Sequence, residues 1–279
     1  FETANFQMTE LSSDSSQRPE CETDMTENST GDLRSSTSPA DSSVVGQYSK
    51  ATQADVIAAI ERARNSLPHW SSRCVTERAA ILERAAELFE ARTAEFTSLI
   101  AKEAGRTLND GLDEVREAVD FCRYYAAQAT SLMHSELELP GITGETNRLS
   151  YAPRGPWLCI SPWNFPLAIF TGQIVANLAV GNTVVAKPAE QTPLVARLAC
   201  DVLNEAGVPE GVINLVNGDG PTLGGWLLPD ERIAGVSFTG SHPSARVINR
   251  QLALRDGPII PLIAETGGIN CMVVDSTAL

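Results

Sequence analysis

The chain divides at about Ser150 into two regions with different patterns of apolar and polar positions. Before that point, apolar residues recur every three or four positions, the spacing that puts side chains on one face of an α-helix. No alternating pattern separates these stretches, so we expect a helical layer over about residues 50–135. The predicted helices cover Ala54–Ser66, a stretch from Thr76 to Phe89, Phe96–Ala104 and about Asp110–Ser131.

Two extended segments flank this layer. Gly46–Tyr48 is a short candidate strand before the first helix. Leu137–Ser150 follows the last helix and is also predicted to be extended, with a turn at Pro140-Gly141, because proline and glycine together are typical of turns.

From Ser150 onward, short β-branched runs alternate with helical segments. This alternation is typical of parallel βαβ units with helices on both faces of the sheet. We therefore predict an α/β fold, with a Rossmann-like parallel sheet over residues 150–265 beside the helical layer. The predicted strands are Trp157–Ile160, Thr183–Ala186, Val212–Val216, Ala234–Phe238 and Ile259–Ala264. The helices between them are Leu167–Ala179, a stretch from Pro193 that Thr192 caps and Gly207 ends, Pro221–Leu228 and Ser244–Leu254.

The first 43 residues have a different composition. Between Thr9 and Ser43, 15 of 35 residues are Ser or Thr, eight are acidic and two are arginines. A segment with so few large apolar side chains cannot offset its ordering entropy, so we expect residues 1–43 to form a disordered acidic tail. Its acidity and the lack of a continuous apolar core do not fit a mitochondrial or secretory leader.

Overall charge and cysteine placement exclude some classes of function. The net charge of −14 argues against a general nucleic-acid or anionic-membrane surface. The most apolar region, residues 156–185, is broken by prolines and amides, so we expect no membrane span. The six cysteines are scattered without a CxxC pair, which favours buried thiols in the reduced cytoplasm.

The stretch SPWNFPLAIF at 161–170 places Asn164 between two aromatic residues and two prolines, at the head of an apolar run. If this amide is buried, leaving it unpaired costs about 1–3 kcal/mol, so it needs a partner. That partner is either structural, with Asn164 capping the helix that begins near Leu167, or a substrate.

Polar and glycine-rich segments follow each predicted strand of the second region. In parallel sheets, ligands bind beyond the carboxyl ends of the strands, so these segments are predicted to lie together. Each alone has a simpler interpretation: a tight turn for the glycines at 218, 220 and 224, a solvated charge for Lys187, an N-cap for Ser241, a strand end for Glu265. The segments are Ser161-Pro-Trp-Asn164-Phe-Pro166, Lys187-Pro188-Ala189-Glu190, the run from Asn217 to Gly224, Thr239-Gly240-Ser241 and Glu265-Thr-Gly-Gly268.

In this order, from about Val44 to Leu279, the segments resemble the NAD(P)-dependent aldehyde dehydrogenase superfamily. The wording SYAPRGPWLCISPWNFPLAIFTGQI, FTGS and AETGG is most similar to the glutamate-semialdehyde (1-pyrroline-5-carboxylate) dehydrogenase branch, in the version fused in bacterial proline-utilisation flavoproteins. The helical run EVREAVDFCRYYAAQA at 114–129 has the same character. The resemblance implies oxidation of L-glutamate γ-semialdehyde to L-glutamate with NAD in proline degradation.

The resemblance also implies roles for particular residues. Asn164 would be the side-chain donor of an oxyanion hole, and Glu265 the general base that activates the nucleophile or the hydrolytic water. Glu117 is a further candidate for the substrate pocket.

For the cofactor, Lys187 and Glu190 would meet the adenosine ribose, and the charge of Glu190 favours NAD over NADP. Gly220 and Gly224 would line the adenine side, and Ser241 would donate to the pyrophosphate at a helix N-terminus. The resemblance also assigns five residues to the cofactor-binding loops: Ser161, Pro162, Thr239, Gly240 and Gly267. No metal ligand set is predicted.

The resemblance places the nucleophilic cysteine beyond the end of this chain, since Leu279 lies only 14 residues after Glu265. Cys271 and Cys159 are interpreted as buried core thiols. Residues 44–265 would then be the NAD-binding domain and residues 266–279 the start of a truncated catalytic domain. We expect a fragment that is inactive alone, from a parent enzyme that is homo-oligomeric and fused to a proline dehydrogenase flavoprotein domain. A non-catalytic cofactor-binding or scaffold homologue, or an aldehyde dehydrogenase of another substrate class, stays open as the alternative.

Overall fold

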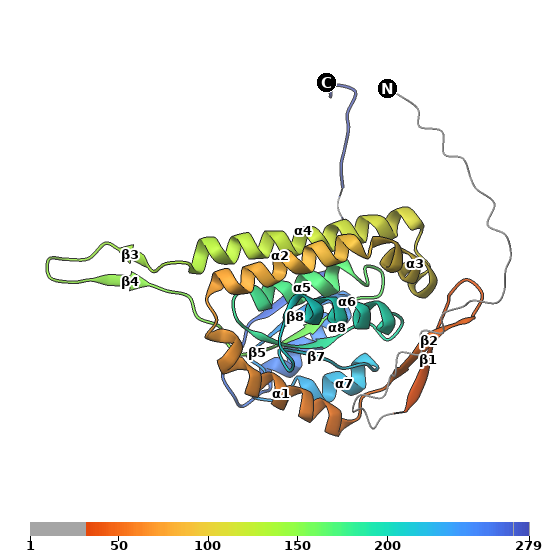
Figure 1. Ribbon diagram of the computed structural model, residues 1–279, viewed down its shortest axis with the longest axis horizontal. Coiled ribbons are helices and arrows are strands. Elements are labelled where there is room, and N and C mark those ends of the chain that lie inside the picture. The colour runs from red at the N-terminus through yellow and green to blue at the C-terminus, as the bar shows by residue number, and fades with distance from the viewer. Residues whose placement is uncertain (1–31, 270, 279) are drawn as a thin grey trace.

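The computed structural model describes residues 32–269 and 271–278. It confirms the α/β prediction: five parallel strands form a sheet with helices on both faces (Figure 1). Along the sheet the order is β7-β6-β5-β8-β9, so the earliest strand of the five in sequence, β5, lies at its centre. The strands are β5 (Pro156–Ile160), β6 (Thr183–Lys187), β7 (Ile213–Leu215), β8 (Gly235–Gly240) and β9 (Leu262–Thr266).

Alternate residues of the central strands enter two separate hydrophobic cores, because successive side chains of a strand point to opposite faces. Trp157 and Cys159 of β5 join the core beneath α5 (Ala168–Ala179) and α6 (Pro193–Ala206). Leu158 joins the other core, with α7 (Gly220–Leu227) and α8 (His242–Ala253). The near-continuous burial of β5 and β6 is that of strands covered on both faces.

The N-terminal helices do not form one layer, contrary to the sequence prediction. α2 (Val75–Ala91) and α4 (Leu108–Met133) pack along each other over α5, with α3 (Thr93–Ala104) at one end (Figure 1). α1 (Gln53–Ser71) instead covers the opposite face, where Val56 and Ile60 share a core with α7 and α8. Helical periodicity shows which side of α1 is apolar, but not which face of the sheet that side covers.

Buried charged side chains of the helical layer cap the helices of the sheet region. Glu103 of α3 accepts hydrogen bonds from the main-chain N–H groups of Leu194 and Val195, both at 2.9 Å. It therefore caps α6, and the side chain of Thr192, the predicted cap, makes no capping hydrogen bond. In α5, Arg78 instead caps the C-terminal end: its Nε donates to the carbonyl oxygen of Ala179, the last residue of that helix, at 3.0 Å. The layer is thus joined to the sheet region by charge-assisted hydrogen bonds as well as by apolar packing.

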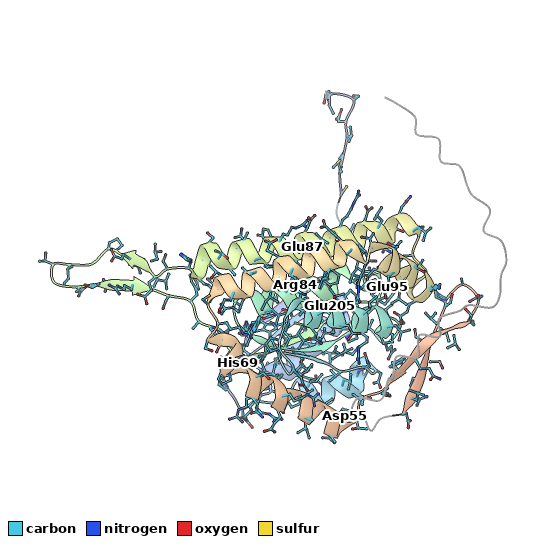
Figure 2. The ribbon with its side chains drawn as sticks, in the orientation of Figure 1. Asp55, His69, Arg84, Glu87, Glu95 and Glu205 are labelled. Carbon is cyan, nitrogen blue, oxygen red and sulfur yellow. The ribbon has the colours of Figure 1, made fainter. Side chains whose placement is uncertain are left out.

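A partly exposed arginine adds a further link between the helices α2 and α3 and the sheet region. Arg92, between α2 and α3, lies 3.7 Å from Glu95 and 3.4 Å from Glu205 of α6. The two glutamates are labelled in Figure 2. All three side chains are a third or more exposed, so this network adds little to stability.

The expected disorder of residues 1–43 is wrong for the part that the structure describes. Leu33–Thr37 forms strand β1, which pairs antiparallel with β2 (Val44–Ser49). Ser36 is buried, and its hydroxyl donates to Glu103 at 2.7 Å. Serine and threonine lack apolar bulk, but a strand satisfies their main chain by pairing, and the hydroxyl of Ser36 meets a buried carboxylate. Residues 1–31 lie outside the described part of the chain.

Leu137–Ser150 is extended as predicted, but its turn is elsewhere. β3 (Leu137–Leu139) and β4 (Asn147–Leu149) form an antiparallel hairpin that projects from the body of the molecule (Figure 1). The turn lies at Thr143-Gly144 rather than Pro140-Gly141. Gly144 has a φ of 96°, a conformation that glycine adopts without steric cost. Within the described residues, no helix is long and apolar enough to cross a membrane.

Candidate functional site

The strands that follow β5 in sequence are added first on one side of it and then on the other. From β5 the chain proceeds through β6 to β7 on one side, then crosses to β8 and β9 on the other. The carboxyl ends of β5 and β8 therefore border a topological switch point, where open parallel sheets bind ligands. A cavity of about 1320 Å³ lies there, and we call it the strand-end cleft. It is lined by the five segments that follow, or end, the parallel strands.

The strand-end cleft brings together every predicted site residue except Glu117. The convergence expected from the sequence is therefore present, whatever the role of each side chain. The lining residues predicted from the sequence are Ser161, Pro162, Asn164, Lys187, Glu190, Gly220, Gly224, Thr239, Gly240, Ser241, Glu265 and Gly267.

Asn164 is exposed rather than buried, so the cost of an unpaired buried amide does not apply to it. Its side chain makes no hydrogen bond within the described part of the chain, and α5 has no side-chain cap at its N-cap position, Leu167. The structural interpretation, with Asn164 capping α5, is therefore wrong. The main chain of Asn164 is held, because Arg106 Nη1 donates to its carbonyl oxygen at 2.5 Å. A fixed main chain with a free amide at a cleft suits a ligand-binding role.

Lys187 is the last residue of β6, and only 6 % of it is exposed. Its ammonium donates to the carbonyl oxygen of Pro188 at 2.9 Å. Burial lowers the pKa of this amine, while the negative charges of Glu190 and Asp219 act in the opposite direction. Lys187 is therefore not the solvated surface charge of the simpler interpretation. Its remaining N–H groups and the exposed carboxylate of Glu190 offer a donor and an acceptor at one wall of the cleft.

A buried hydroxyl without a partner lies at the switch point. Ser161, directly after β5, is 5 % exposed, and its Oγ atom makes no hydrogen bond within the described residues. Beside it, Gln173 Nε2 donates to Ile160 O at 3.2 Å and Thr239 Oγ1 at 3.0 Å, which ties β5 to β8. The Oε1 atom of Gln173 is also unpaired. Two unpaired polar atoms lining one cleft fit a ligand with hydroxyl or amide groups, such as a dinucleotide.

The helix starts on the other wall leave space for such a ligand. A Cβ atom at Gly220 would meet nothing within 4 Å, so a side chain there would occupy the cleft. Ser241 is the N-cap of α8, where its hydroxyl accepts from Ser244 N at 3.2 Å. The capping interpretation of Ser241 is thus confirmed, and its hydroxyl proton points to Ser244 Oγ at 2.9 Å. A ligand would compete with that second contact, and not with the cap itself.

Glu265 lies inside β9 rather than after it, because β9 begins at Leu262, three residues later than predicted, and ends at Thr266. Its side chain is exposed and lines the strand-end cleft. Gly267 follows β9 at the same edge, and a Cβ atom there would meet nothing within 4 Å. The carboxylate therefore stands on a paired strand, with an open glycine segment immediately beyond it.

Glu117 lies on α4 with an exposed side chain and is not among the residues that line the cleft. Partial desolvation of its carboxyl by the surrounding protein and the charge of Asp120 raise the pKa of Glu117. Phe121 and Tyr125, one and two turns further along α4, line the cleft instead. The structure thus brings α4 to the site through aromatic side chains.

Sequence reasoning missed Glu114, which is 1 % exposed. One carboxylate oxygen accepts from Leu167 N at 3.0 Å and Ala168 N at 3.4 Å, and so caps α5 behind the Asn164 segment. Burial raises the pKa of this carboxyl to about 6, although those two N–H groups and Arg106 act to lower it. A glutamate on the apolar side of a helical pattern was the signal available, because such a residue is rarely buried without a partner.

Three cysteines are buried and two are exposed among the residues described. Burial raises the pKa of Cys122 and Cys200 to about 12, and it raises that of Cys159 as well. Cys159 is therefore a core thiol, as predicted. Cys271 is exposed and outside any strand, so its interpretation as a buried thiol is wrong. None of the described cysteines lines the strand-end cleft.

Comparison with known proteins finds a matching family model and relatives that carry related names. Residues 25–278 match the model of the aldehyde dehydrogenase family. The bifunctional protein PutA of Escherichia coli is 50% identical over 239 residues, which are 85% of this chain and 17% of that protein. The 1-pyrroline-5-carboxylate dehydrogenase 2 of Bacillus subtilis is 39% identical over 247 residues, 87% of this chain and 48% of the relative.

Solved structures agree with the sequence relatives. A variant of Thermus thermophilus 1-pyrroline-5-carboxylate dehydrogenase superposes with a TM-score of 0.83 and 36% identity, over 86% of this chain and 48% of that one. This chain thus spans about half the length, or less, of these relatives. The family match covers nearly all of the chain, and the parallel sheet places the matching segments around one cleft. The chain belongs to the aldehyde dehydrogenase family.

Proposed function

We propose that the full-length protein containing this chain oxidises L-glutamate γ-semialdehyde to L-glutamate, with NAD+ as the hydride acceptor, in proline degradation. The substrate class is inferred from relatives named PutA and 1-pyrroline-5-carboxylate dehydrogenase. The observation that carries the proposal is the convergence of Asn164, Glu265, Lys187 and Glu190 on one cleft at the carboxyl ends of the strands. An amide donor, a carboxylate base and a polar site for a dinucleotide are the groups that this oxidation requires.

Asn164 would donate its side-chain N–H to the oxygen of the aldehyde as that oxygen becomes negative in the tetrahedral adduct. One such donor contributes ~3–4 kcal/mol to the stability of a transition state. In support of this role, the Asn164 amide forms no hydrogen bond within the described residues, while its main chain is fixed by Arg106. A donor that is already free and held in place needs little reorganisation when the charge develops.

Glu265 would act as general base, taking a proton from the nucleophile or from the water that releases the acid. It lines the same cleft as Asn164, and its strand is paired with β8 through the main chain. No cation lies within salt-bridge distance of its carboxylate among the described residues, so no ion pair holds the proton-accepting oxygens.

The residues around the cleft fit a dinucleotide. Lys187 and Glu190 would bind the adenosine ribose, the open face at Gly220 would admit the adenine, and the N-terminus of α8 at Ser241 would face the pyrophosphate. Ser161 Oγ, buried and unpaired, would gain a partner when the cofactor binds. Bound NAD+ supplies the acceptor for the hydride that leaves the aldehyde carbon.

The reaction also requires a thiolate that attacks the aldehyde and forms the thioester that water later hydrolyses. None of the described cysteines lines the cleft, so we propose that this group comes from another part of the full-length protein. We propose further that the parent is homo-oligomeric and cytoplasmic, and, from the relatives named bifunctional protein PutA, that it is fused to a proline dehydrogenase domain.

The test is a steady-state assay of NADH formation by the full-length protein. We expect kcat/KM for L-glutamate γ-semialdehyde to exceed that for unsubstituted aliphatic aldehydes by at least about tenfold, because a site built for charged groups rejects substrates that lack them. Better turnover of the aliphatic aldehydes would overturn the substrate assignment. Asn164→Ala should lower kcat by about 100-fold while leaving the Kd of NAD+ nearly unchanged.

A further inference from the structure

Two charged residues that take no part in the proposed chemistry, Arg106 and Glu114, hold the segment that presents Asn164. Arg106, in the connection between α3 and α4, donates from Nη1 to the carbonyl oxygen of Asn164 at 2.5 Å. The centre of its guanidinium group lies 4.4 Å from the ring centroid of Phe165. The Arg106 side chain thus contacts two consecutive residues of the segment, Asn164 by a hydrogen bond and Phe165 by a cation–π contact.

Glu114 holds the other end of the same segment. Its Oε2 atom accepts from the main-chain N–H groups of Leu167 and Ala168, on the far side of Pro166. Its Oε1 atom lies 3.5 Å from Arg106 Nε. These two atoms have no hydrogen-bond partner, so the contact between them is an ion pair without hydrogen-bond geometry.

The Arg106–Glu114 pair is largely shielded from water, which strengthens the electrostatic attraction between the two side chains. Glu114 is 1 % exposed and the side chain of Arg106 is 19 % exposed. A weaker contact joins Arg106 Nη2 to Asp110, at 3.8 Å. Pro166 itself has no N–H to donate. Arg106 and Glu114 contact the segment on both sides of it, at Asn164 O, the Phe165 ring and the N–H groups of Leu167 and Ala168.

We propose that the Arg106–Glu114 pair is the positioning device of the oxyanion donor: it fixes the main chain of residues 164–168 so that the Asn164 amide points into the strand-end cleft. This inference rests on the proposed function. Neither residue lines the cleft, so both act through Asn164 and are positioning residues. A misplacement of about 1 Å at a catalytic group can cost 100-fold in rate, so a device that holds the main chain affects turnover rather than cofactor binding.

The activity test is a double-mutant cycle in the full-length protein, with any aldehyde that the wild type oxidises. We expect Arg106→Met to lower kcat by about tenfold or more, Arg106→Lys to lower it less because lysine keeps one donor, and the Kd of NAD+ to change by less than about threefold. In the Asn164→Ala background, Arg106→Met should cost less than about twofold, because its target has already been removed. Equal costs in both backgrounds would overturn the proposal.

A second measurement does not depend on turnover. Hydrogen–deuterium exchange of the peptide spanning residues 161–170 should accelerate in Arg106→Met and Glu114→Gln. It should not change in the control Arg116→Met, since Arg116 is a 71 % exposed side chain on α4 whose one ion pair among the described residues is with Asp113. Unchanged exchange in both variants would overturn the positioning role, even if the full-length protein oxidises no aldehyde. If Arg106→Met does not fold, Arg106→Lys and Glu114→Gln complete the same comparisons.

Discussion

Thr239 and Glu265 are register partners in the neighbouring parallel strands β8 and β9. The hydroxyl of Thr239 is in turn bonded to Gln173 of α5, whose amide also reaches the end of β5. Glu265 is therefore placed at the strand-end cleft by main-chain pairing to a strand that is itself tied to the centre of the sheet. Its position depends on β9 remaining paired, and not on the conformation of a loop.

Replacing Glu265 by glutamine should remove the proposed base and keep the fold. We expect Glu265→Gln to lower kcat of the full-length protein by at least about 100-fold, since a positioned general base contributes roughly 10²–10⁴ in rate. Steady-state NADH formation measures this, and NAD+ titration should give a nearly unchanged Kd. The matched control is Glu87→Gln, an exposed glutamate on α2 (Figure 2) that does not line the cleft. Wild-type turnover by Glu265→Gln would rule out the base role.

Glu190 should set the choice between NAD and NADP. Its exposed carboxylate lines the cleft beside Lys187, and a 2′-phosphate at that position would meet a like charge. We expect Glu190→Gln to tighten NADP binding relative to NAD by about tenfold, because the repulsive element is removed. Fluorescence titration with both dinucleotides measures the ratio.

The control for this substitution is Glu210→Gln, an exposed glutamate outside the cleft, which should leave the ratio as in the wild type. An unchanged ratio in Glu190→Gln would show that the selection against a 2′-phosphate lies elsewhere.

Glu114 should make the folded chain less stable as the pH rises. Burial raises its pKa to about 6 from an ordinary value of 4.5, so the folded state binds this proton more tightly than the unfolded state does. The stabilisation is complete below about pH 4.5 and is lost as the pH rises to about 6. The shift corresponds to about 2 kcal/mol in the free energy of unfolding.

The measurement is chemical denaturation of wild type and Glu114→Gln between pH 4 and pH 7. Because glutamine cannot ionise, the stability of the variant relative to wild type should increase by about 2 kcal/mol across this range. Other groups titrate in both proteins and cancel in the difference. A difference that is constant, or that changes in the opposite direction, contradicts the assignment.

Trp157 and Gly235 make a close contact near the amino-terminal ends of β5 and β8, away from the strand-end cleft. They are register partners in β5 and β8, and a Cβ atom on Gly235 would lie 2.3 Å from the indole ring. The ring cannot turn away freely, because its Nε1 donates to Ser237 at 2.9 Å in a buried position. We expect Gly235→Ala to lower the free energy of unfolding by about 1–3 kcal/mol.

The control is Gly225→Ala in α7, where a Cβ atom would meet nothing within 4 Å. Alanine in a helix should there add about 0.5–1 kcal/mol, the opposite sign. Denaturation midpoints of the two variants distinguish a steric clash from a general effect of replacing glycine. Equal stability of Gly235→Ala and wild type would show that the ring has room to move.

Much of the site could be predicted from local patterns. The segments predicted to follow β5, β6 and β8 lie at the carboxyl ends of those strands, and Ser241 begins α8 as predicted, because strand ends and helix starts depend on residues close in the sequence. Lys187 and Thr239-Gly240 differ only in being the last residues of their strands rather than the first after them. Glu117 shows the limit of such reasoning. A helical pattern identifies its polar face, but which turn of α4 reaches the cleft depends on how that helix packs on α5, and Phe121 and Tyr125 lie at the contact.

The sequence by itself determined the alternation of strands and helices, the parallel sheet, and the set of polar segments that meet at its carboxyl edge, since these follow from periodicity, chain direction and local sterics. Only the tertiary structure decided which face α1 covers, that β1 forms, and that Glu103 and Glu114 cap α6 and α5. The physical reason is that burying a charge is favourable only with its partners in place. Those partners come from segments far apart in the chain, and folding alone brings them together.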